Sequence, residues 1–312
     1  MSWPDGQGTQ MRMVGRARDL LTAGDGTAAI VASGSLRAGI EPDRTIADIA
    51  VEPVRPGIDT LVGARGGGGL RAAIDAAVPD DRRRHTPLAL LLDDIAGASL
   101  VGGFAWSRQR DEANAARGGG APAAADTRVR PPGLTRQMAG ICAGFRPGSG
   151  ALKADGTVSA LEHNVAAVPP LTDPADPLGW HLLDPLEAVG FRRARRMDVW
   201  QEGGEFRIDA HFRDSCSDPG LGEVGVHEYR LVASVDLESQ IVTSLVATPL
   251  VLPFAECPAA SPNVAWLVGE PLAALRSRVL EVLRGPDCCT HLNDALRALA
   301  DTAVLLELVG LS

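Results

Sequence analysis

Four segments in the C-terminal part of the chain alternate apolar and polar residues along their length. Alternation of this kind, with short polar connections, is typical of half-buried antiparallel strands. Gly203-Gly204 connects the first two segments, and a short polar stretch at 237–239 connects the last two. We therefore expect a four-stranded antiparallel meander built from residues 195–202, 205–214, 227–236 and 240–252.

After Pro253 the apolar positions follow a helical period instead. Val264, Leu267 and Val268 predict a short helix, and residues 271–283 predict a second one. The second opens on a proline, which helices tolerate in their first turn. An apolar stripe predicts the last helix, at Leu292, Leu296, Leu299, Ala303 and Leu306. Strands followed by helices predict an α+β module in which the helices cover one sheet face.

A similar series of residues occurs near the N-terminus. Arg18-Asp19 matches Arg213-Asp214, an offset of 195 residues. Further matches follow in order: Leu36 with Leu231, Ala38 with Ala233, Ile40 with Val235, Ile46 with Ile241, Ile49 with Leu245, Pro53 with Pro249, Leu61-Val62-Gly63 with Leu267-Val268-Gly269, Leu70-Arg71 with Leu275-Arg276, and Thr86-Pro87-Leu88 with Thr290-His291-Leu292. An ordered series at a nearly constant offset predicts an internal duplication, so we expect two diverged copies of one module.

The repeat predicts three parts. Residues 1–106 form a degenerate N-terminal copy, and residues 191–312 form the C-terminal copy. Residues 107–190 between them form a flexible linker, rich in Ala, Gly, Arg and Pro around Gly118-Gly119-Gly120, and then an irregular segment that wraps a surface. The irregular part contains the chain breakers Pro169-Pro170 and Asp173-Pro174.

The two copies share core and turn positions but differ in cysteine and histidine. His211 aligns with Arg16, His227 with Ala32, His291 with Pro87 and Cys289 with His85, while Cys257 lies in a stretch that the first copy lacks. We expect the C-terminal copy to carry a functional site and the N-terminal copy to serve as its structural partner. The alternative is that these residues are unevenly distributed by chance.

The cysteine and histidine at the start of the last predicted helix could support two kinds of chemistry. A cysteine at a helix N-terminus meets the helix dipole and free amides, which favour the thiolate. Cys289 and His291 could bind a metal ion, Zn²⁺ or iron, with His227 and Cys257 completing a tetrahedral site. Alternatively, Cys289 and His291 act as catalytic nucleophile and base. Cysteines are also often buried simply as small apolar residues.

His211 and Asp214 are weaker candidates for the same site. They lie three positions apart on one predicted strand, so their side chains should point to opposite faces unless the strand bulges or ends between them. Both copies contain the Arg-Asp pair to which Asp214 belongs, which favours a structural role. Cys142 and Cys216 are expected to fill core positions.

Composition and charge narrow the classes of partner. A net charge of −9 argues against nucleic acid as the main partner. No apolar run approaches the ~20 residues that a membrane span needs, and the N-terminal residues lack the apolar core of a signal peptide. Five cysteines with one adjacent pair do not suggest a disulfide framework, so we expect a reducing, cytoplasmic compartment. A small-molecule substrate is the expected partner, and the sequence does not indicate an oligomeric state.

Several short motifs stand out between residues 191 and 308. They are Arg192-Arg193, Asp209-Ala210-His211, Cys257-Pro258, Leu267-Val268-Gly269 and Cys289-Thr290-His291-Leu292. With these motifs, residues 191–308 resemble an uncharacterised bacterial family catalogued as domain of unknown function 2889. Residues 90–105 and 176–199 resemble its longer actinobacterial branch. The resemblance brings no settled activity with it.

The order of C-terminal elements also resembles iron–sulfur assembly scaffold proteins of the U type. Those proteins have a three-stranded meander with one ligand before the second strand, a cysteine after the third strand and a cysteine before the last helix. His227, Cys257 and Cys289 fall at comparable places. This sequence departs in having no cysteine directly before His227-Glu228 and in placing His291 after Cys289. The resemblance therefore implies a fold and a metal-capable corner more than cluster assembly.

Three hypotheses follow. The first is a small-molecule enzyme of the hydrolase, lyase or isomerase type, in which a metal polarises a carbonyl or activates water. The second is a metal or iron–sulfur carrier, or a partner-binding module, with an exposed site of four protein ligands. The third is a structural protein, in which Cys257 and Cys289 are buried and far apart.

Overall fold

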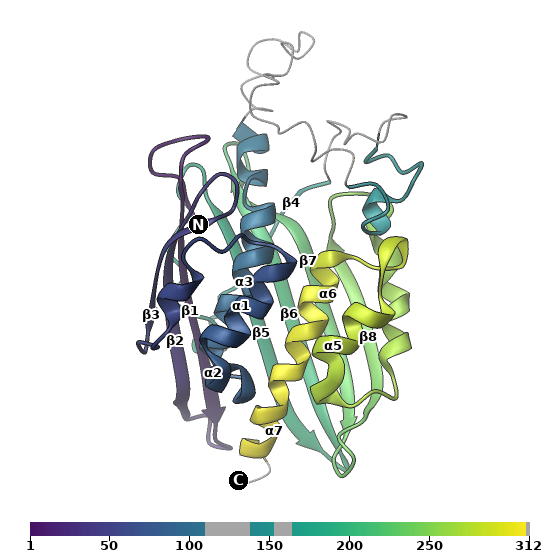
Figure 1. Cartoon of the computed structure of the whole chain (residues 1–312). Helices are drawn as coiled ribbons and strands as arrows, with labels where there is room; N and C mark the ends of the chain where they lie inside the picture. The colour runs from purple at the N-terminus through teal and green to yellow at the C-terminus, as the bar shows by residue number, and fades with distance from the viewer. Residues whose placement is uncertain (110–137, 153–163, 310–312) are drawn as a thin grey trace. The chain divides into compact units, whose positions relative to one another are not determined.

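A computed structural model describes residues 1–109, 138–152 and 164–309 and divides the chain into two compact units. The first, the N-terminal unit, contains Met1–Ser107, Pro169–Arg192 and Val304–Ser312, and the second, the C-terminal unit, contains Arg108–Val168 and Arg193–Ala303. The predicted α+β class is confirmed, because each unit combines an antiparallel sheet with helices (Figure 1). The glycine-rich part of the predicted linker, at 118–120, lies outside the described residues.

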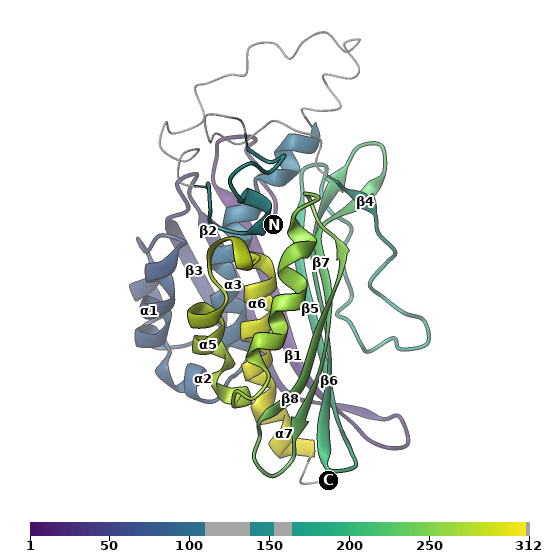
Figure 2. The ribbon, with the colours of Figure 1, turned by 90° about the vertical axis from the view of Figure 1, so that its right-hand side faces the viewer.

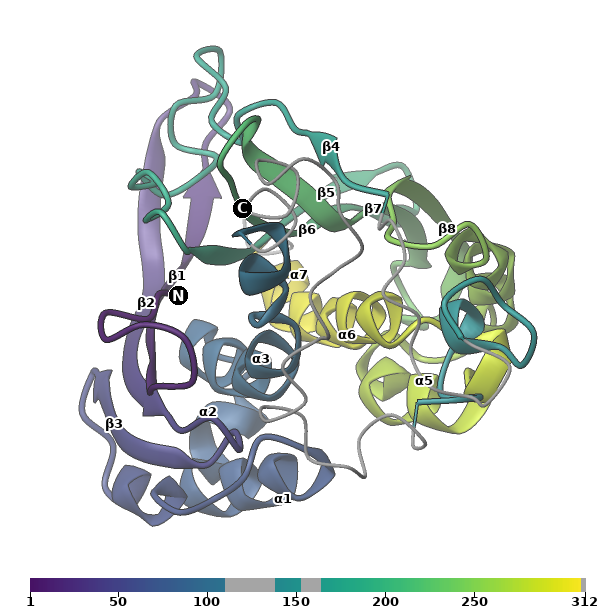
Figure 3. The ribbon, with the colours of Figure 1, turned by 90° about the horizontal axis from the view of Figure 1, so that it is seen from above.

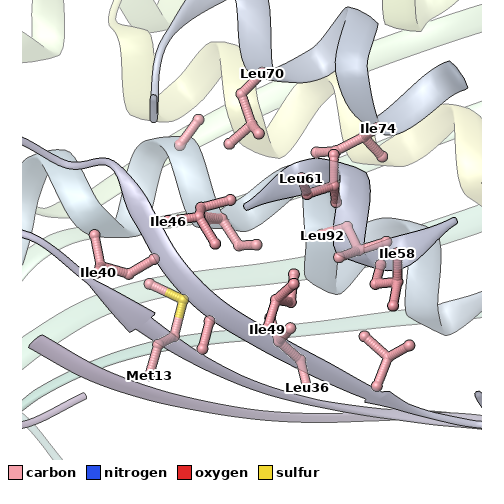
Figure 4. Close-up of a cluster of buried hydrophobic side chains, with 14 of the residues drawn as sticks. Met13, Leu36, Ile40, Ile46, Ile49, Ile58, Leu61, Leu70, Ile74 and Leu92 are labelled. Carbon is pink, nitrogen blue, oxygen red and sulfur yellow. The ribbon is translucent and has the colours of Figure 1, made fainter. Parts of the chain in front are cut away.

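The N-terminal unit contains a three-stranded antiparallel sheet of order β1-β2-β3. Apolar side chains of this sheet, including Leu36 and Ile49, pack against helical residues such as Leu92 to form a buried core (Figure 4). The elements of the unit are β1 (Met11–Thr22), β2 (Ala28–Ile40), β3 (Ile46–Glu52), the 3-10 helix η1 (Ile58–Leu61), α1 (Gly68–Ala77), α2 (Pro79–Arg83) and α3 (Pro87–Val101).

The helix that begins at Pro87 corrects one expectation. The helical stretch Pro87–Gln109, with 23 residues, is long and apolar enough to cross a membrane by length and composition alone. More than half of its apolar window is buried, and Leu88, Leu92 and Ile95 are at most 1% exposed. This burial is consistent with the core helix of a soluble protein.

The C-terminal unit contains the predicted meander. Strands β5 (Phe191–Glu202), β6 (Glu205–Asp218), β7 (Gly222–Asp236) and β8 (Val242–Val251) are neighbours in that order, and the short β4 (Ala166–Ala167) also pairs with β7. The β6–β7 hairpin extends beyond the predicted end at residue 214. Its last residues alternate poorly, because Ser215, Cys216 and Ser217 are all buried.

Helices follow the meander and cover one face of the sheet of the C-terminal unit (Figure 2). Helix α5 packs beside α6 (Figure 3). The helices predicted at 271–283 and from 292 onward each change type along their length. The elements are the 3-10 helix η4 (Cys257–Leu267), η5 (Leu272–Ala274), α5 (Leu275–Val282), η6 (Gly285–Asp287), α6 (Thr290–Ala298) and η7 (Leu299–Thr302), with η3 (Ala143–Phe145) earlier in the chain. Helix α7 (Ala303–Val309) follows η7, and from Val304 onward the chain belongs to the N-terminal unit.

Irregularities in the two sheets occur at matching positions. The register between β1 and β2 shifts between Asp19 and Leu20, and that between β6 and β7 shifts between Asp214 and Ser215. At the next strand, β2 shifts against β3 after Gly39, and β7 shifts against β8 after Ser234. Asp19 and Asp214 are separated by 195 residues, as are Gly39 and Ser234.

The loops that follow the sheets also share their hydrogen bonds. In the N-terminal unit, Gly63 N donates to Ile46 O at 2.8 Å and Gly66 N donates to Arg44 O at 2.8 Å. In the C-terminal unit, Gly269 N donates to Val242 O at 2.8 Å and Leu272 N donates to Gln240 O at 3.0 Å. Arg44 and Gln240 both have positive φ, at 73° and 56°. The two units therefore agree in backbone detail as well as in the order of their elements.

Candidate metal centre

Asp214, His227 and His291 lie together in the C-terminal unit. Each offers one potential ligand atom, and these atoms all lie within 4.8 Å of one another. Asp214 on β6 stands opposite His227 on β7 in the strand register, and His291 is the second residue of α6. Three separate elements of the unit thus place two imidazoles and one carboxylate in a single cluster, which we call the His/Asp cluster.

The two imidazole rings of the His/Asp cluster are stacked. The ring centroids of His227 and His291 are 3.5 Å apart, and the ring planes differ by 16°. A metal ion bound by histidine lies near the ring plane at about 2.0–2.1 Å from nitrogen. Nearly parallel rings do not direct their lone pairs to one point, so one ring must rotate before both can bind the same ion.

Asp214 forms a buried ion pair with Arg193. The Nε and Nη2 atoms of Arg193 each donate to one carboxylate oxygen of Asp214 at 2.8 Å, a bidentate arrangement. The two side chains are only 4% and 0% exposed. The Nδ1 atom of His227 lies 3.9 Å from Asp214 Oδ2. The guanidinium of Arg193 therefore already compensates the charge of the Asp214 carboxylate. A metal ion bound at the cluster would have to share that carboxylate with Arg193.

Burial and two nearby arginines keep His291 neutral. Burial contributes most, followed by Arg193 and Arg195, and together they lower the pKa of His291 to about 3. A neutral imidazole is the form that binds a metal ion. The cluster therefore holds at least one histidine ready for coordination at neutral pH.

This lowered pKa predicts a loss of stability in acid. Between the ordinary pKa of 6.5 and about 3, the unfolded chain binds a proton at His291 that the folded chain does not bind. The contribution of His291 to stability is therefore present above pH 6.5 and is lost as the pH falls. In metal-free protein we expect the unfolding free energy of His291→Gln to decrease less than that of the wild type over this range. Denaturant titrations at successive pH values test this, and parallel pH curves would contradict it.

Cys289 lies beside the His/Asp cluster as a neutral thiol. Its Sγ atom is 4.0 Å from His291 Nδ1, and the residue is 3% exposed. Burial raises the pKa of Cys289 to about 11 and outweighs the Tyr229 hydroxyl and the backbone amides at the start of α6, which lower it. The expected thiolate at this helix N-terminus was therefore wrong for the metal-free protein, which weakens the hypothesis of a Cys289–His291 nucleophile and base.

Cys257 lies among other cysteines and is not part of the His/Asp cluster. It is 4% exposed, and burial raises the pKa of its thiol to about 12, with smaller contributions from Cys289 and Cys142. Both Cys257 and Cys289 are buried, as the structural hypothesis expects, but their thiols are close enough to interact electrostatically. The structure thus separates the four predicted ligands. His227 and His291 lie together in the His/Asp cluster, Cys257 lies near other cysteines, and Cys289 lies between the two groups.

His211 points away from the His/Asp cluster, as the strand alternation predicts. Its Nε2 atom lies 2.7 Å from Glu228 Oε1, and Arg213 Nη2 donates to the same oxygen at 2.6 Å. Glu228 and Arg213 are almost fully buried. His211 therefore belongs to a separate network on the other face of β6.

A groove lies on the N-terminal unit. It has a volume of about 410 Å³ and lies at the start of α1. Its lining comprises Arg44, Ala64, Arg65, Gly66, Gly67, Gly69 and Leu70. No cysteine or histidine lines this groove, so it does not coincide with the candidate metal ligands.

Sequence reasoning ranked Asp214 too low for its observed position. The signal that could have raised it is the strand pairing, since Asp214 faces His227 only because the β6–β7 register runs unbroken up to this pair and shifts immediately after it. The sequence alone showed neither the longer hairpin nor the position of the bulge.

Comparison with known proteins finds one similarity. No curated protein and no solved structure matches the chain significantly. Residues 191–305 match the model of a protein family described as protein of unknown function (DUF2889). The match includes all three residues of the His/Asp cluster. It ends at residue 305, close to residue 308, where the resemblance described in the sequence ends. This part of the chain is therefore similar to the DUF2889 family.

Proposed function

We propose that the C-terminal unit binds a divalent transition-metal ion through Asp214, His227 and His291 and uses it in chemistry on a small-molecule substrate. One observation carries this proposal: three donor atoms from β6, β7 and α6 lie within 4.8 Å of one another. Two imidazoles and a carboxylate suit Zn²⁺ or Fe²⁺. One ring would have to rotate before all three residues could hold the same ion.

Three protein ligands favour a catalytic role over a purely structural one. Structural zinc sites normally have four protein ligands, whereas catalytic sites keep one position for water or substrate. A metal in that arrangement can polarise a carbonyl or activate water, which corresponds to hydrolase, lyase or isomerase chemistry. We propose a cytoplasmic enzyme of this kind, consistent with the neutral thiols and with the absence of disulfides among the described cysteines.

Cys289 separates this proposal from the main alternative, a metal carrier related in fold to iron–sulfur scaffold proteins. Its sulfur is 4.0 Å from His291 Nδ1, so it could become a fourth ligand. A fourth protein ligand would close the site and favour storage, transfer or structure. Cobalt substitution distinguishes the two, because sulfur-to-cobalt charge-transfer absorption that disappears in Cys289→Ser would identify the closed site.

We further propose that the two units arose by duplication and that only one kept the metal ligands. The matching bulges support this, because bulges are conserved features within protein families. In the N-terminal unit, Asp19 occupies the position of Asp214, but Ala32 and Pro87 replace the two histidines. The N-terminal unit thus retains the framework and lacks the donors, as a structural partner would.

Metal analysis of single-site variants tests the proposed function. We expect the His/Asp cluster of full-length wild-type protein, purified without a histidine tag, to bind one equivalent of Zn²⁺ or Fe²⁺. His227→Ala and His291→Ala should each weaken binding by more than about tenfold, because losing even an outer-shell partner of a ligand typically costs that much. Elemental analysis after dialysis and calorimetric titration of the metal-free protein measure this.

His211→Ala is the matched control, since it removes another partly buried imidazole from the same hairpin without touching the His/Asp cluster. It should bind metal as the wild type does. Equal metal binding in the wild type and all three variants, or none in the reconstituted wild type, would refute the proposal. Circular dichroism of the metal-free variants verifies that each one is folded.

A further inference from the structure

Four of the five cysteines in the chain gather at one place in the C-terminal unit. The clearest geometric marker is Gly144 in η3. A Cβ atom at this glycine would lie 2.8 Å from Cys257 Sγ and 3.9 Å from Cys142 Sγ. Cys257 Sγ therefore fills the place that a side chain at Gly144 would take, and Cys142 Sγ lies at the edge of that place. We call Cys142, Cys257, Cys288 and Cys289 the thiol cluster.

Backbone contacts bring the remaining two cysteines to the same place. Ala143 N donates to Cys288 O at 2.8 Å, and Cys288 Sγ lies 3.7 Å from Ile141 O. The segment containing Cys142 is thus attached to the residues just before α6, where Cys289 follows directly. Three separate segments, namely η3, the start of η4 and residues 288–289, contribute to the thiol cluster.

The four thiols interact with one another. Burial is the main cause that raises the pKa of Cys257 and of Cys288 to about 12, but neighbouring thiols add to it in both cases. For Cys288 the contributing thiols are Cys142 and Cys289. Mutual repulsion between thiolates is the kind of cost that a bound cation removes.

The fully buried hydroxyl of Tyr229 gives an independent indication of a ligand. Tyr229 is 0% exposed, and its hydroxyl lies beside the neutral thiol of Cys289, with no stronger acceptor in contact with it in the described part of the chain. Burial raises the pKa of Tyr229, and Cys289, Cys257 and Cys142 raise it further, so the hydroxyl lies near these thiols. A buried donor without a strong acceptor is unfavourable. A thiolate formed on metal binding would supply the acceptor.

We propose that the thiol cluster is a second metal site, specific for a soft cation, and that it is separate from the His/Asp cluster. On binding, a divalent ion replaces thiol protons, which pass to solvent, and two thiolates balance its charge. Cys142, Cys257 and Cys288 supply sulfur, and Cys289 lies between this site and His291. Soft thiolate ligands favour Zn²⁺, Cd²⁺ or Cu⁺ over harder ions.

The sulfurs must move closer when the ion binds. Tetrahedral coordination at about 2.3 Å places sulfur atoms roughly 3.8 Å apart. Among the described residues, the His/Asp cluster is the group of three or more donors already within 4.8 Å of one another. Cys257 Sγ already occupies the place of a side chain at Gly144, so a larger residue at this position would displace that sulfur.

Titration of the reduced, metal-free, full-length protein with Cd²⁺ tests this second site. Sulfur-to-cadmium charge transfer gives ultraviolet absorption that histidine and carboxylate ligands do not produce. We expect the absorption to reach a plateau at one equivalent in the wild type. Cys142→Ser and Cys288→Ser should lose most of it and bind Cd²⁺ more than about tenfold more weakly.

Cys216→Ser is the matched control, because Cys216 is equally buried and has a similarly raised pKa, near 12, but has different neighbours. It should behave as the wild type does. His291→Ala should keep the sulfur absorption, which separates this proposal from the proposed function. No absorption in the wild type, or equal absorption in the wild type, Cys142→Ser and Cys288→Ser, would overturn it. Alanine variants and circular dichroism distinguish ligand loss from misfolding.

Discussion

Replacing Arg193 with alanine is expected to lower the unfolding free energy of the metal-free protein by about 3–5 kcal/mol, because a buried carboxylate is left without its counter-charge. Arg193 donates twice to Asp214, and the carboxylate is fully buried. Urea unfolding in the presence of a chelator, monitored by circular dichroism, measures this loss.

An exposed ion pair in the same sheet provides the control for Arg193→Ala. Arg230 forms a bidentate pair with Asp209, with side-chain exposures of 58% and 29%. Arg230→Ala should cost only about 0–1 kcal/mol, since exposed pairs contribute little. Equal effects of the two substitutions would show that burial of Asp214 does not determine the loss.

The same variant also links stability to the proposed metal. Without Arg193, the carboxylate of Asp214 is left to the cation alone, so Arg193→Ala should gain more stability from added Zn²⁺ than the wild type gains. Ligand binding to the folded state stabilises it in proportion to the logarithm of ligand concentration over Kd. A metal-independent stability of Arg193→Ala would argue against a cation beside Asp214.

Replacing either Leu92 or Leu296 with alanine is expected to cost about 2–5 kcal/mol, because each removes a large side chain from a packed core. The two leucines are matched, because both are 0% exposed and each lies at the same distance in sequence after its threonine, Leu92 after Thr86 and Leu296 after Thr290. Denaturant titration measures both losses, and separate transitions would show that the two units unfold independently.

Metal affinity should separate these two substitutions. Leu296 lies on α6, whose second residue is His291, whereas Leu92 belongs to the core of the N-terminal unit. Under conditions where both variants are folded, only Leu296→Ala should weaken metal binding. Equal weakening by Leu92→Ala would mean that the metal site depends on the N-terminal core.

The strands and helices of the C-terminal unit could be predicted because their apolar positions repeat regularly. The ends of β6 and β7 could not, since polar residues such as Ser215 and Ser217 are buried there and interrupt the alternation. The apolar length of the helix beginning at Pro87 could not be recognised either, because the polar pair Asp93-Asp94 interrupts the apolar run, which resumes at Ile95.

The candidate site was predictable only in part, for a related reason. Comparison of the two copies selected His227 and His291, which the structure brings into contact. It could not assign Cys257 to the thiol cluster, because that grouping depends on Cys142 and Gly144, which lie far away in sequence. The balance of effects at Cys289 was also hidden, since burial can be judged only once the surrounding side chains are known.

The bulge after Asp214 marks the end of the regular β6–β7 pairing, and up to that point successive side chains alternate between the two faces of the sheet. Arg213 joins Glu228 on one side of the sheet, while its neighbour Asp214 joins Arg193 on the other, so one dipeptide anchors two charge networks. Adding or removing a single residue just before this pair would shift the register by one position, so that Arg213 and Asp214 would each point to the opposite face of the sheet. The register of β6 thus determines that the carboxylate of Asp214, and not the guanidinium of Arg213, lies beside His227 and His291.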